Sequence, residues 1–512
     1  MHIREHSILA PDRPALLLYP SGVSITFAEV ESRSNRLAHH LRRRGLHVGQ
    51  AVAVLMDNNE HFLTVMWAAR RAGLYYVPVS THLTAPEIAH IVQDCGAGAI
   101  VGSAATAAQC AAVVQHLDSP PDIRLMADSD LTGWQRYPEC VANEPDTPIT
   151  DESEGDLLQY SSGTTGRPKG IRRPLSEAPP EATASPIAGL LDALGLGSES
   201  CYLSPAPLYH TAPVVWSMSA QSVGATVVVM ERFDAAGALD AIERHRVTHA
   251  QFVPTMFVRM LKLPTTTRAA HELGSLRRVV HAAAPCPVPV KHEMIRWWGP
   301  IIDEFYSSSE GAGVTFITAQ EWLERPGSVG RPVLGRAHIL DENGIELPHG
   351  ETGEVFFEGG YSFDYLNDPA KTAAARNMAG WVSVGDMGHL DGDGYLYLTD
   401  RRHHMIISGG VNIYPREAED VLVSHPDVLD AAVIGIPDPE MGQQVTAVVQ
   451  PVNPSDATPA FAGELLSWVR DRLAHYKCPR SIVFDAQLPR TATGKMLKAE
   501  VVARHSPLEP NQ

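Results

Sequence analysis

Segments typical of buried strands alternate with amphipathic helices near the start of this chain, and that alternation constrains its fold most strongly. Apolar runs long enough for buried strands lie at residues 51–56, 75–79 and 99–102. Helical patterns lie at residues 27–41, at 61–72 and beyond residue 84. Thr26 with Glu29, and Thr84 with Glu87, each form the capping-box pattern that starts a helix. Alternating strands and helices predict a parallel α/β sheet.

The alternation continues downstream and then changes character near residue 400. Further strand candidates lie at residues 225–230, 250–253, 278–282 and 301–306. Residues 173–200 are rich in proline and small residues, which predicts a surface loop. The last part of the chain shows a helix at 415–424, strands at 428–436 and 443–452, and a helix at 463–475. We therefore expect the α/β class, with a large α/β domain at residues 1–400 and a small α+β domain at residues 401–512.

Composition excludes several classes of protein. Of the 512 residues, 44% are hydrophobic and 20% are charged, which is typical of a folded globular protein. The formal net charge of −18 disfavours nucleic acid as a partner. Six cysteines without a C-x-x-C pair indicate reduced thiols. Because neither a signal peptide nor an apolar run of 18 residues is present, we expect a cytoplasmic protein without a membrane span.

Residues 160–170 read Tyr-Ser-Ser-Gly-Thr-Thr-Gly-Arg-Pro-Lys-Gly and suit a loop that binds the triphosphate of ATP. Glycines let backbone N–H groups approach phosphate oxygens, while hydroxyls donate hydrogen bonds and a lysine adds positive charge. The spacing differs from that of a Walker A loop, and shorter Gly/Ser/Thr clusters are often ordinary surface turns. The residues expected to contact phosphate are Ser161, Ser162, Gly163, Thr164, Thr165, Gly166 and Lys169.

This string resembles the phosphate loop of the adenylate-forming superfamily, which contains acyl- and aryl-CoA ligases, adenylation domains of peptide synthetases, and beetle luciferases. Other strings follow in that family's order and spacing: PLYH at 207–210, HAAAP at 281–285, YSSSE at 306–310, GD at 385–386, DR at 400–401, GGVNIYP at 409–415 and TGK at 493–495. The resemblance spans about residue 10 to about residue 500 and favours the CoA-ligase branch. It implies an ATP-dependent enzyme that forms acyl-AMP and pyrophosphate, then acyl-CoA and AMP.

The first half-reaction brings two anions together, so cations must offset their repulsion. The resemblance implies that Lys495 bridges the carboxylate and the α-phosphate in the adenylation conformation. It also implies that Glu310, with the hydroxyl of Thr165, holds Mg²⁺, a hard ion that prefers oxygen ligands. Without the family context, a lysine after a glycine or a lone glutamate is usually an ordinary surface residue.

The remaining nucleotide contacts are also implied by the resemblance. Asp386 would accept both ribose hydroxyls, because a carboxylate offers two oxygens to a vicinal diol. Arg401 would meet the same ribose, and Ser309 keeps the hydroxyl that the family has as threonine. The residues expected around adenine are Tyr306, Ala283, Ala284, Pro285 and Glu304.

The acid-binding residues are implied by family position. His210 would lie near the substrate carboxylate, and the absence of a Phe-Asp pair there argues against amino acid substrates. Ser307 adds bulk where the family commonly has glycine. The expected pocket residues are Trp216, Phe252, Thr255, Met256, Ala282, Ser307 and Gly311. This mostly apolar set favours a bulky aromatic, alicyclic or medium-to-long aliphatic carboxylic acid over acetate.

The C-terminal domain of the family turns on a hinge and presents two faces to one active site. His403 falls at the position where the family usually has its hinge Asp or Lys. Gly409 and Gly410 fit the Gly-rich turn that lines the channel for coenzyme A in the second half-reaction.

Two other functions remain open from the sequence. The acyl group could pass to an amine or to a carrier protein, which we expect to be separate because no carrier domain follows Lys495. A non-catalytic nucleotide-binding protein is disfavoured, because decay usually removes the catalytic charges first. The sequence does not distinguish a monomer from a homodimer.

Overall fold

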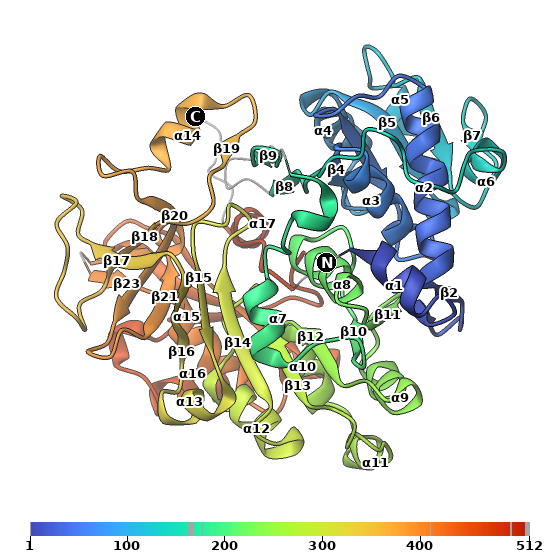
Figure 1. Cartoon of the computed structure of the whole chain (residues 1–512). Helices are drawn as coiled ribbons and strands as arrows, with labels where there is room; N and C mark the ends of the chain where they lie inside the picture. Colours follow the sequence, from blue (N-terminus) through green and yellow to red (C-terminus); the bar gives the residue numbers. More distant parts are fainter. Residues whose placement is uncertain (1, 162–167, 177, 410, 492–493, 507–512) are drawn as a thin grey trace.

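The structure is a computed structural model of the whole chain. It describes all residues except 1, 162–167, 177, 410, 492–493 and 507–512. The side chains of residues 161, 403 and 412 also lie outside the description. Figure 1 shows an N-terminal α/β unit beside a larger body that is built on a long twisted sheet, with the C-terminal segments packed against that body.

The N-terminal unit is built on a parallel sheet of five strands. In spatial order these are β4 (Tyr75–Pro78), β3 (Ala51–Leu55), β5 (Ala97–Gly102), β6 (Ile123–Met126) and β7 (Gln135–Arg136). The helices of this part of the chain are α1 (Ile3–Leu9), α2 (Phe27–Arg43), α3 (Phe62–Arg71), α4 (Ala85–Asp94), α5 (Ala107–Val114) and α6 (Tyr137–Val141). Both predicted capping boxes are present, at the starts of α2 and α4. The parallel sheet and both helix starts are therefore confirmed.

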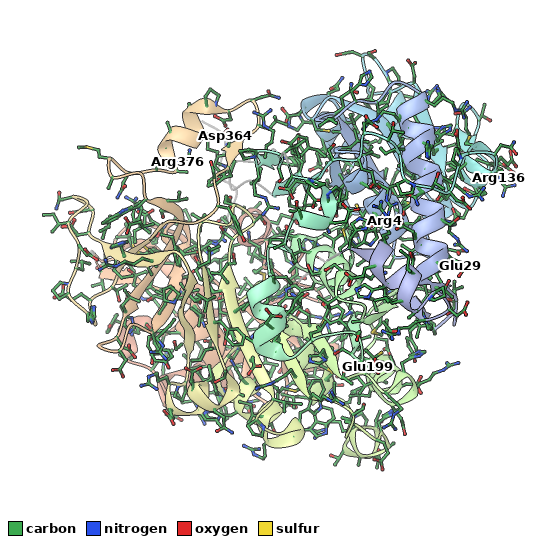
Figure 2. All side chains as sticks on the ribbon, viewed as in Figure 1. Arg4, Glu29, Arg136, Glu199, Asp364 and Arg376 are labelled. Atoms are coloured by element: carbon green, nitrogen blue, oxygen red, sulfur yellow. The ribbon has the colours of Figure 1, made fainter. Side chains whose placement is uncertain are left out.

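Buried ion pairs hold the first helices of this unit together. The Arg71 side chain of α3 is fully buried, and its Nη2 lies 2.5 Å from the Glu31 carboxylate of α2. Arg4 of α1, seen in Figure 2 where α1 meets α2, contacts Glu31 and Glu152. Because buried charges require partners, removing one member of this group should be strongly destabilising.

The larger body contains a mixed sheet of thirteen strands. The spatial order is β17 (Arg336–Leu340), β18 (Gly353–Glu358), β20 (Val382–Leu390), β21 (Leu396–Arg401), β16 (Ser328–Leu334), β15 (Val314–Ile317), β14 (Ile302–Ser307), β13 (Arg278–His281), β12 (His249–Phe252), β10 (Cys201–Ser204), β11 (Thr226–Met230), β1 (Pro14–Tyr19) and β2 (Ser24–Thr26). The strands from β14 to β1 pair in parallel, and the others pair antiparallel. The downstream strand predictions at 225–230, 250–253, 278–282 and 301–306 are confirmed within a residue or two.

The helices of the larger body are α7 (Ala188–Leu194), α8 (Thr211–Ser222), α9 (Ala235–His245), α10 (Pro254–Leu261), α11 (Thr265–Ala269), α12 (Val288–Trp298), α13 (Ala319–Glu324) and α14 (Pro369–Ala374). A small sheet joins β19 (Asp364–Tyr365), β9 (Lys169–Arg172) and β8 (Gln159–Ser161). The prediction of a loop over 173–200 is wrong at α7. Leu190, Leu191 and Leu194 lie on one face of that helix and are buried in the core. This apolar burial stabilises the helix although the residues before it are rich in proline.

The C-terminal domain has its own sheet and core. Its strands are β22 (Ile406–Ser408), β23 (Val411–Ile413), β24 (Val428–Asp438), β25 (Gly442–Pro451) and β26 (Ser481–Phe484), and its helices are α15 (Pro415–Val423), α16 (Pro459–Arg470) and α17 (Lys498–His505). The helix predicted at 463–475 begins earlier, because Thr458 caps it and Pro459 suits its first turn. The last strand of the large sheet ends at Arg401, and a 3₁₀ turn over Arg402–His404 leads into β22.

All six cysteines are free. Within the described residues, every helix is too short or too polar to cross a membrane.

Candidate active site

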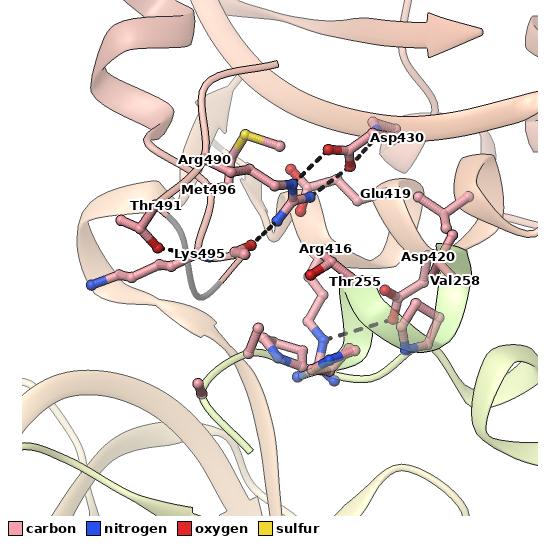
Figure 3. A pocket seen from close by; sticks show the side chains of 18 of the residues that line it. Thr255, Val258, Arg416, Glu419, Asp420, Asp430, Arg490, Thr491, Lys495 and Met496 are labelled. Carbon is pink, nitrogen blue, oxygen red and sulfur yellow. Dashed lines mark hydrogen bonds and ion pairs between the residues drawn. The ribbon is translucent and has the colours of Figure 1, made fainter. Parts of the chain in front are cut away.

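A cavity of about 580 Å³ opens between the large sheet and the C-terminal domain. Figure 3 shows side chains from both domains around it. The predicted site residues that line it are Thr255, Met256, Ala282, Ala283, Ala284, Pro285, Glu304, Tyr306, Ser307, Asp386, Arg401 and Lys495. The residues predicted around adenine and ribose therefore meet in one place, together with Lys495.

The cavity lies at the carboxyl ends of two neighbouring parallel strands, β13 and β14. Ligands of open α/β sheets bind at this edge. Directly after β13, Ala283 adopts a left-handed φ of 73°, which is rare for a residue with a Cβ. Such backbone strain costs about 1–3 kcal/mol and concentrates at ligand sites. The segment predicted to flank adenine is thus held in an unusual conformation.

A buried charge cluster lies at the base of the cavity. The Glu304 carboxylate is 2.7 Å from the Lys291 ammonium of α12 and 3.3 Å from the His281 ring of β13. Burial alone would raise the pKa of Glu304, but the His281 ring and the Lys291 ammonium lower it to about 2. Glu304 is therefore a fixed anion beside the predicted adenine position. Lys291 was not predicted, because a single lysine in a helix gives no sequence signal.

Asp386 is held by two of its predicted neighbours. The Tyr306 hydroxyl donates to Asp386 Oδ2 at 2.6 Å, and Arg401 Nε lies 3.1 Å from Oδ1. Asp386 on β20 and Arg401 on β21 are direct cross-strand partners, which explains their proximity. Each carboxylate oxygen has two acceptor sites, so this fixed carboxylate can still accept ribose hydroxyls.

Lys495 comes from the C-terminal domain and reaches the same cavity. Burial and the charge of Arg401 lower the pKa of Lys495 to about 8, although Asp386 and Glu310 favour its charged form. The preceding residue, Gly494, is seated against the first domain: a Cβ placed on it would lie 2.2 Å from Thr255 Oγ1. The structure therefore presents Lys495 to the predicted nucleotide site.

The predicted phosphate loop lies mostly outside the described residues, including Ser162, Gly163, Thr164, Thr165 and Gly166; the side chain of Ser161 is likewise outside them. The two ends of the loop are held together, because Ser161 of β8 pairs with Lys169 of β9. The Lys169 ammonium lies 3.5 Å from Asp368 Oδ2 at the start of α14.

A second cation, Lys371, lies near Lys169. Its ammonium is 4.2 Å from the centre of the Tyr365 ring. Burial lowers the pKa of Lys371, and the nearby positive charge of Lys169 lowers it further. The Tyr365 hydroxyl donates to Glu310 Oε1 at 2.8 Å. Sequence reasoning missed Lys371, whose only signal is its place in the first turn of a helix capped by Asp368.

The residues near Glu310 fit a magnesium ion that is held jointly with a nucleotide. Among the described residues no group of three His, Cys, Asp or Glu side chains could hold a metal ion. Mg²⁺ in nucleotide sites commonly takes only one or two carboxylates, with phosphate oxygens and water as its other ligands. One carboxylate oriented by a tyrosine hydroxyl is consistent with that arrangement.

His210 directly precedes α8 and serves as its N-cap residue. Burial, with the nearby His82, lowers the pKa of His210 to about 4, so the ring is neutral near pH 7. In the next residue, Thr211 Oγ1 lies 3.2 Å from Ser309 Oγ, which brings the start of α8 next to the string at 306–310. His210 and Ser309 are therefore close in space, although neither lines the cavity described above.

The predicted acid pocket is divided in the structure. Met256, Ala282 and Ser307 line the cavity, whereas Trp216 and Phe252 are fully buried in the core and do not. The Trp216 ring stacks on Tyr202 at 6.3 Å and approaches Phe305, which does line the cavity, at 5.6 Å. Phe252 contacts the rings of Phe257 and Trp298. A Cβ on Gly311 would lie 2.9 Å from the Tyr361 ring.

The predicted coenzyme A turn does not contribute its described residue, Gly409, to the lining of this cavity. Gly409 is exposed, its N–H donates to Met441 O at 2.8 Å, and it is absent from the cavity lining. Gly410 and the side chain of the predicted hinge His403 lie outside the described residues.

Comparisons with known proteins agree with this site. The family model described as AMP-binding enzyme matches residues 4–364, and the AMP-binding enzyme C-terminal domain matches residues 417–495. A feruloyl-CoA synthase of an Amycolatopsis species is 34% identical over 94% of this chain and 94% of that protein. An indoleacetate–CoA ligase of Aromatoleum aromaticum is 33% identical over 99% of this chain and 98% of that protein.

Among solved structures, the amide bond synthetase McbA from Marinactinospora thermotolerans superposes with a TM-score of 0.81. It is 27% identical, and the match covers 98% of this chain and 100% of that chain. The family matches, the full-length relatives and the shared architecture confirm the resemblance found in the sequence. The chain therefore belongs to the adenylate-forming superfamily of AMP-binding enzymes, in its acyl- and aryl-CoA ligase branch.

Proposed function

We propose that this chain is an ATP-dependent carboxylic acid:CoA ligase that works in two half-reactions. The observation that carries the proposal is that Lys495 of the C-terminal domain reaches the cavity formed by Tyr306, Asp386 and Arg401 of the large sheet. A site shared by two domains in this way places the Lys495 ammonium where two anionic substrates, ATP and the carboxylate, must meet.

In the first half-reaction, an oxygen of the acid attacks the α-phosphorus of ATP, and pyrophosphate leaves. Asp386 and Arg401 bind the ribose, the segment after β13 flanks adenine, and Glu304 accepts from the adenine amine. The Lys495 ammonium offsets the charge that builds up as the carboxylate approaches the phosphate. Magnesium, when bound beside Glu310, supplies further positive charge to the phosphates.

Lys169 and Lys371 extend this positive charge toward the pyrophosphate end. Both lie near the small sheet that carries the phosphate loop, Lys169 is close enough to Lys371 to lower its pKa, and Asp368 pairs with Lys169. His210 is neutral at physiological pH, so it contributes a hydrogen bond near the acid rather than a charge.

The second half-reaction requires a different presentation of the C-terminal domain. The thiolate of coenzyme A attacks the acyl carbonyl, and AMP leaves. Gly409 lies outside the cavity in this arrangement. We therefore propose that the C-terminal domain rotates near His403, which moves Lys495 out of the active site and brings the Gly409 turn into it.

The acid is proposed to carry an aromatic ring. The lining at Met256, Ala282, Phe305 and Ser307 is largely apolar and includes one aromatic ring, as is typical of sites that bind apolar small molecules. The two relatives described above act on feruloyl and indoleacetate substrates by their names, which supports the same class. Medium-to-long aliphatic acids are the alternative class.

A second candidate acceptor is an amine. The likeness to the amide bond synthetase covers nearly the whole of both chains, so the fold is compatible with amide formation. The chemistry of the first half-reaction would be unchanged, and only the nucleophile that attacks acyl-AMP would differ.

The proposed function is tested by pyrophosphate release over a panel of aromatic and aliphatic carboxylic acids, with coenzyme A, an amine or a carrier protein as acceptor. We expect release to depend on the acid, to be strongest with aryl-substituted acids, and to turn over repeatedly only with coenzyme A. Lys495→Ala is the negative control. Turnover with an amine but not with coenzyme A would transfer the assignment to amide synthesis.

A further inference from the structure

The loop that carries Lys495 is held by an arginine that no part of the mechanism above uses. Arg490 binds the Asp430 carboxylate with two parallel contacts, Nε to Oδ2 at 2.5 Å and Nη2 to Oδ1 at 2.6 Å. Its third nitrogen, Nη1, donates to the carbonyl of Gly494. Figure 3 shows this arginine between Asp430 and the segment that carries Lys495, with dashed lines running to both.

The two ends of the loop are also paired through the backbone. Arg490 forms a bridge with Met496, and Thr491 N donates to Lys495 O at 2.8 Å. Gly494 N donates in turn to Thr491 O at 2.8 Å. The described residues on either side of this segment are therefore paired with each other, and the Gly494 carbonyl bound by Arg490 belongs to the residue just before Lys495.

Asp430 is a rigid anchor for this turn. It lies on β24, which pairs with β25 along most of its length, and its Oδ1 also accepts from Ala431 N at 2.8 Å. The Arg490 and Asp430 side chains are both largely buried, at 21% and 15% exposed, so water screens their attraction less than at an open surface.

We propose that Arg490 is a positioning residue for adenylation: clamped on Asp430, it holds the Gly494 carbonyl and so fixes the turn that presents Lys495 to the nucleotide. The inference rests on the proposed function, because Lys495 must act in the first half-reaction. The planar guanidinium can bind a carboxylate with two nitrogens and a carbonyl with the third, whereas an ammonium is a single point of charge.

The expected loss of adenylation rate without the Arg490 contacts follows from the conformational freedom that the Lys495 side chain would regain. A long cationic side chain on a loose turn must be ordered again in each transition state, and a misplacement of about 1 Å can cost about 100-fold in rate. Arg490→Gln should therefore lower the rate of adenylation by about 10- to 100-fold. Thioester formation from supplied acyl-AMP should stay within about two-fold, because Lys495 serves only the first step.

The test compares four variants of the full chain in both half-reactions. Arg490→Gln removes the guanidinium that joins Asp430 to the Gly494 carbonyl. Asp430→Asn replaces the carboxylate with an amide of the same size and so weakens its contact with Arg490. Arg490→Lys keeps the positive charge but cannot bind the carboxylate and the carbonyl with separate nitrogens. Arg472→Gln is the matched control: it removes an arginine of the same domain that contacts the carbonyl and the ring of Trp468, and neither residue lines the cavity. We expect adenylation to fall in the first three variants and to stay unchanged in Arg472→Gln.

A double-mutant cycle with Lys495→Ala separates positioning from a general structural role. If Arg490 acts through Lys495, then adding Arg490→Gln to Lys495→Ala lowers adenylation by no more than about two-fold further. An additive loss, a parallel loss of thioester formation, or full activity of Arg490→Lys would each overturn the inference. If the wild-type chain forms no acyl-AMP with any acid, the proposed function fails instead, so the two failures are distinguishable.

Discussion

Gly494 offers the sharpest test of how the two domains meet during adenylation. Its φ is +77°, and a Cβ there would lie 2.2 Å from Thr255 Oγ1 and 3.0 Å from Thr255 Cγ2. Gly494→Ala therefore has two separate costs. The left-handed backbone costs about 1–2 kcal/mol for a residue with a Cβ, which is about 5- to 30-fold in rate. The contact with Thr255 cannot persist at that distance, so Lys495 must withdraw.

We expect Gly494→Ala to lower adenylation by about 100-fold or more, the scale for losing one preorganised charge. Thioester formation from acyl-AMP should be nearly unchanged, because the Gly494–Thr255 contact belongs to the adenylation arrangement. The assay is quenched-flow measurement of each half-reaction, with thermal unfolding as the control for folding.

A compensating substitution separates the two costs. Thr255→Ala removes both atoms that the new Cβ would meet most closely and leaves Thr255 Cβ at 3.2 Å. In the Thr255→Ala background, Gly494→Ala should cost only the backbone part, about 5- to 30-fold. The reasoning would be refuted if Gly494→Ala alone lost less than about three-fold, or if Thr255→Ala restored none of the loss.

Three further predictions concern other contacts of the site. Because the pKa of Lys495 is lowered to about 8 and the charged form is active, kcat/KM for adenylation should fall as pH rises through about 8, and Lys495→Arg should remove that limb of the pH profile. Asp386→Ala should weaken ATP binding at least about 10-fold in calorimetric titration, and wild type should lose a similar factor with 2′,3′-dideoxy-ATP. Lys262 donates to Pro426 O at 2.8 Å across the domains, so Lys262→Met should slow adenylation about 2- to 10-fold in the quenched assay and spare thioester formation.

The sequence predicted features that depend on short-range patterns or on a contiguous motif. The capping box of Thr26 and Glu29 is local chemistry, and the apolar run of β3 needs only a buried setting. Asp386 and Arg401 were each recognised by motif, but their direct pairing depends on the register of two strands. That register is set by the whole sheet, which no local pattern reveals.

Contacts between distant residues account for what the sequence did not reveal. Arg490 and Asp430 are separated by 60 positions, and each is an ordinary charged residue in its own segment. Lys291 becomes a partner of Glu304 only because α12 packs beside β14. The burial of Trp216 likewise depends on Tyr202 and Phe305, which come from two different strands.

The most direct test of the central claim is a single-turnover experiment with ATP labelled at the α-phosphate, which follows acyl-AMP, AMP and ADP, and in parallel with ATP labelled at the γ-phosphate, which follows pyrophosphate. With an accepted aromatic acid and no coenzyme A, acyl-AMP and pyrophosphate should form in equal amounts, and neither should form without the acid. Addition of coenzyme A should then convert the acyl-AMP into equal amounts of acyl-CoA and AMP. Formation of ADP, or acyl-AMP that coenzyme A leaves unchanged while an amine consumes it, would contradict the assignment as an acid:CoA ligase.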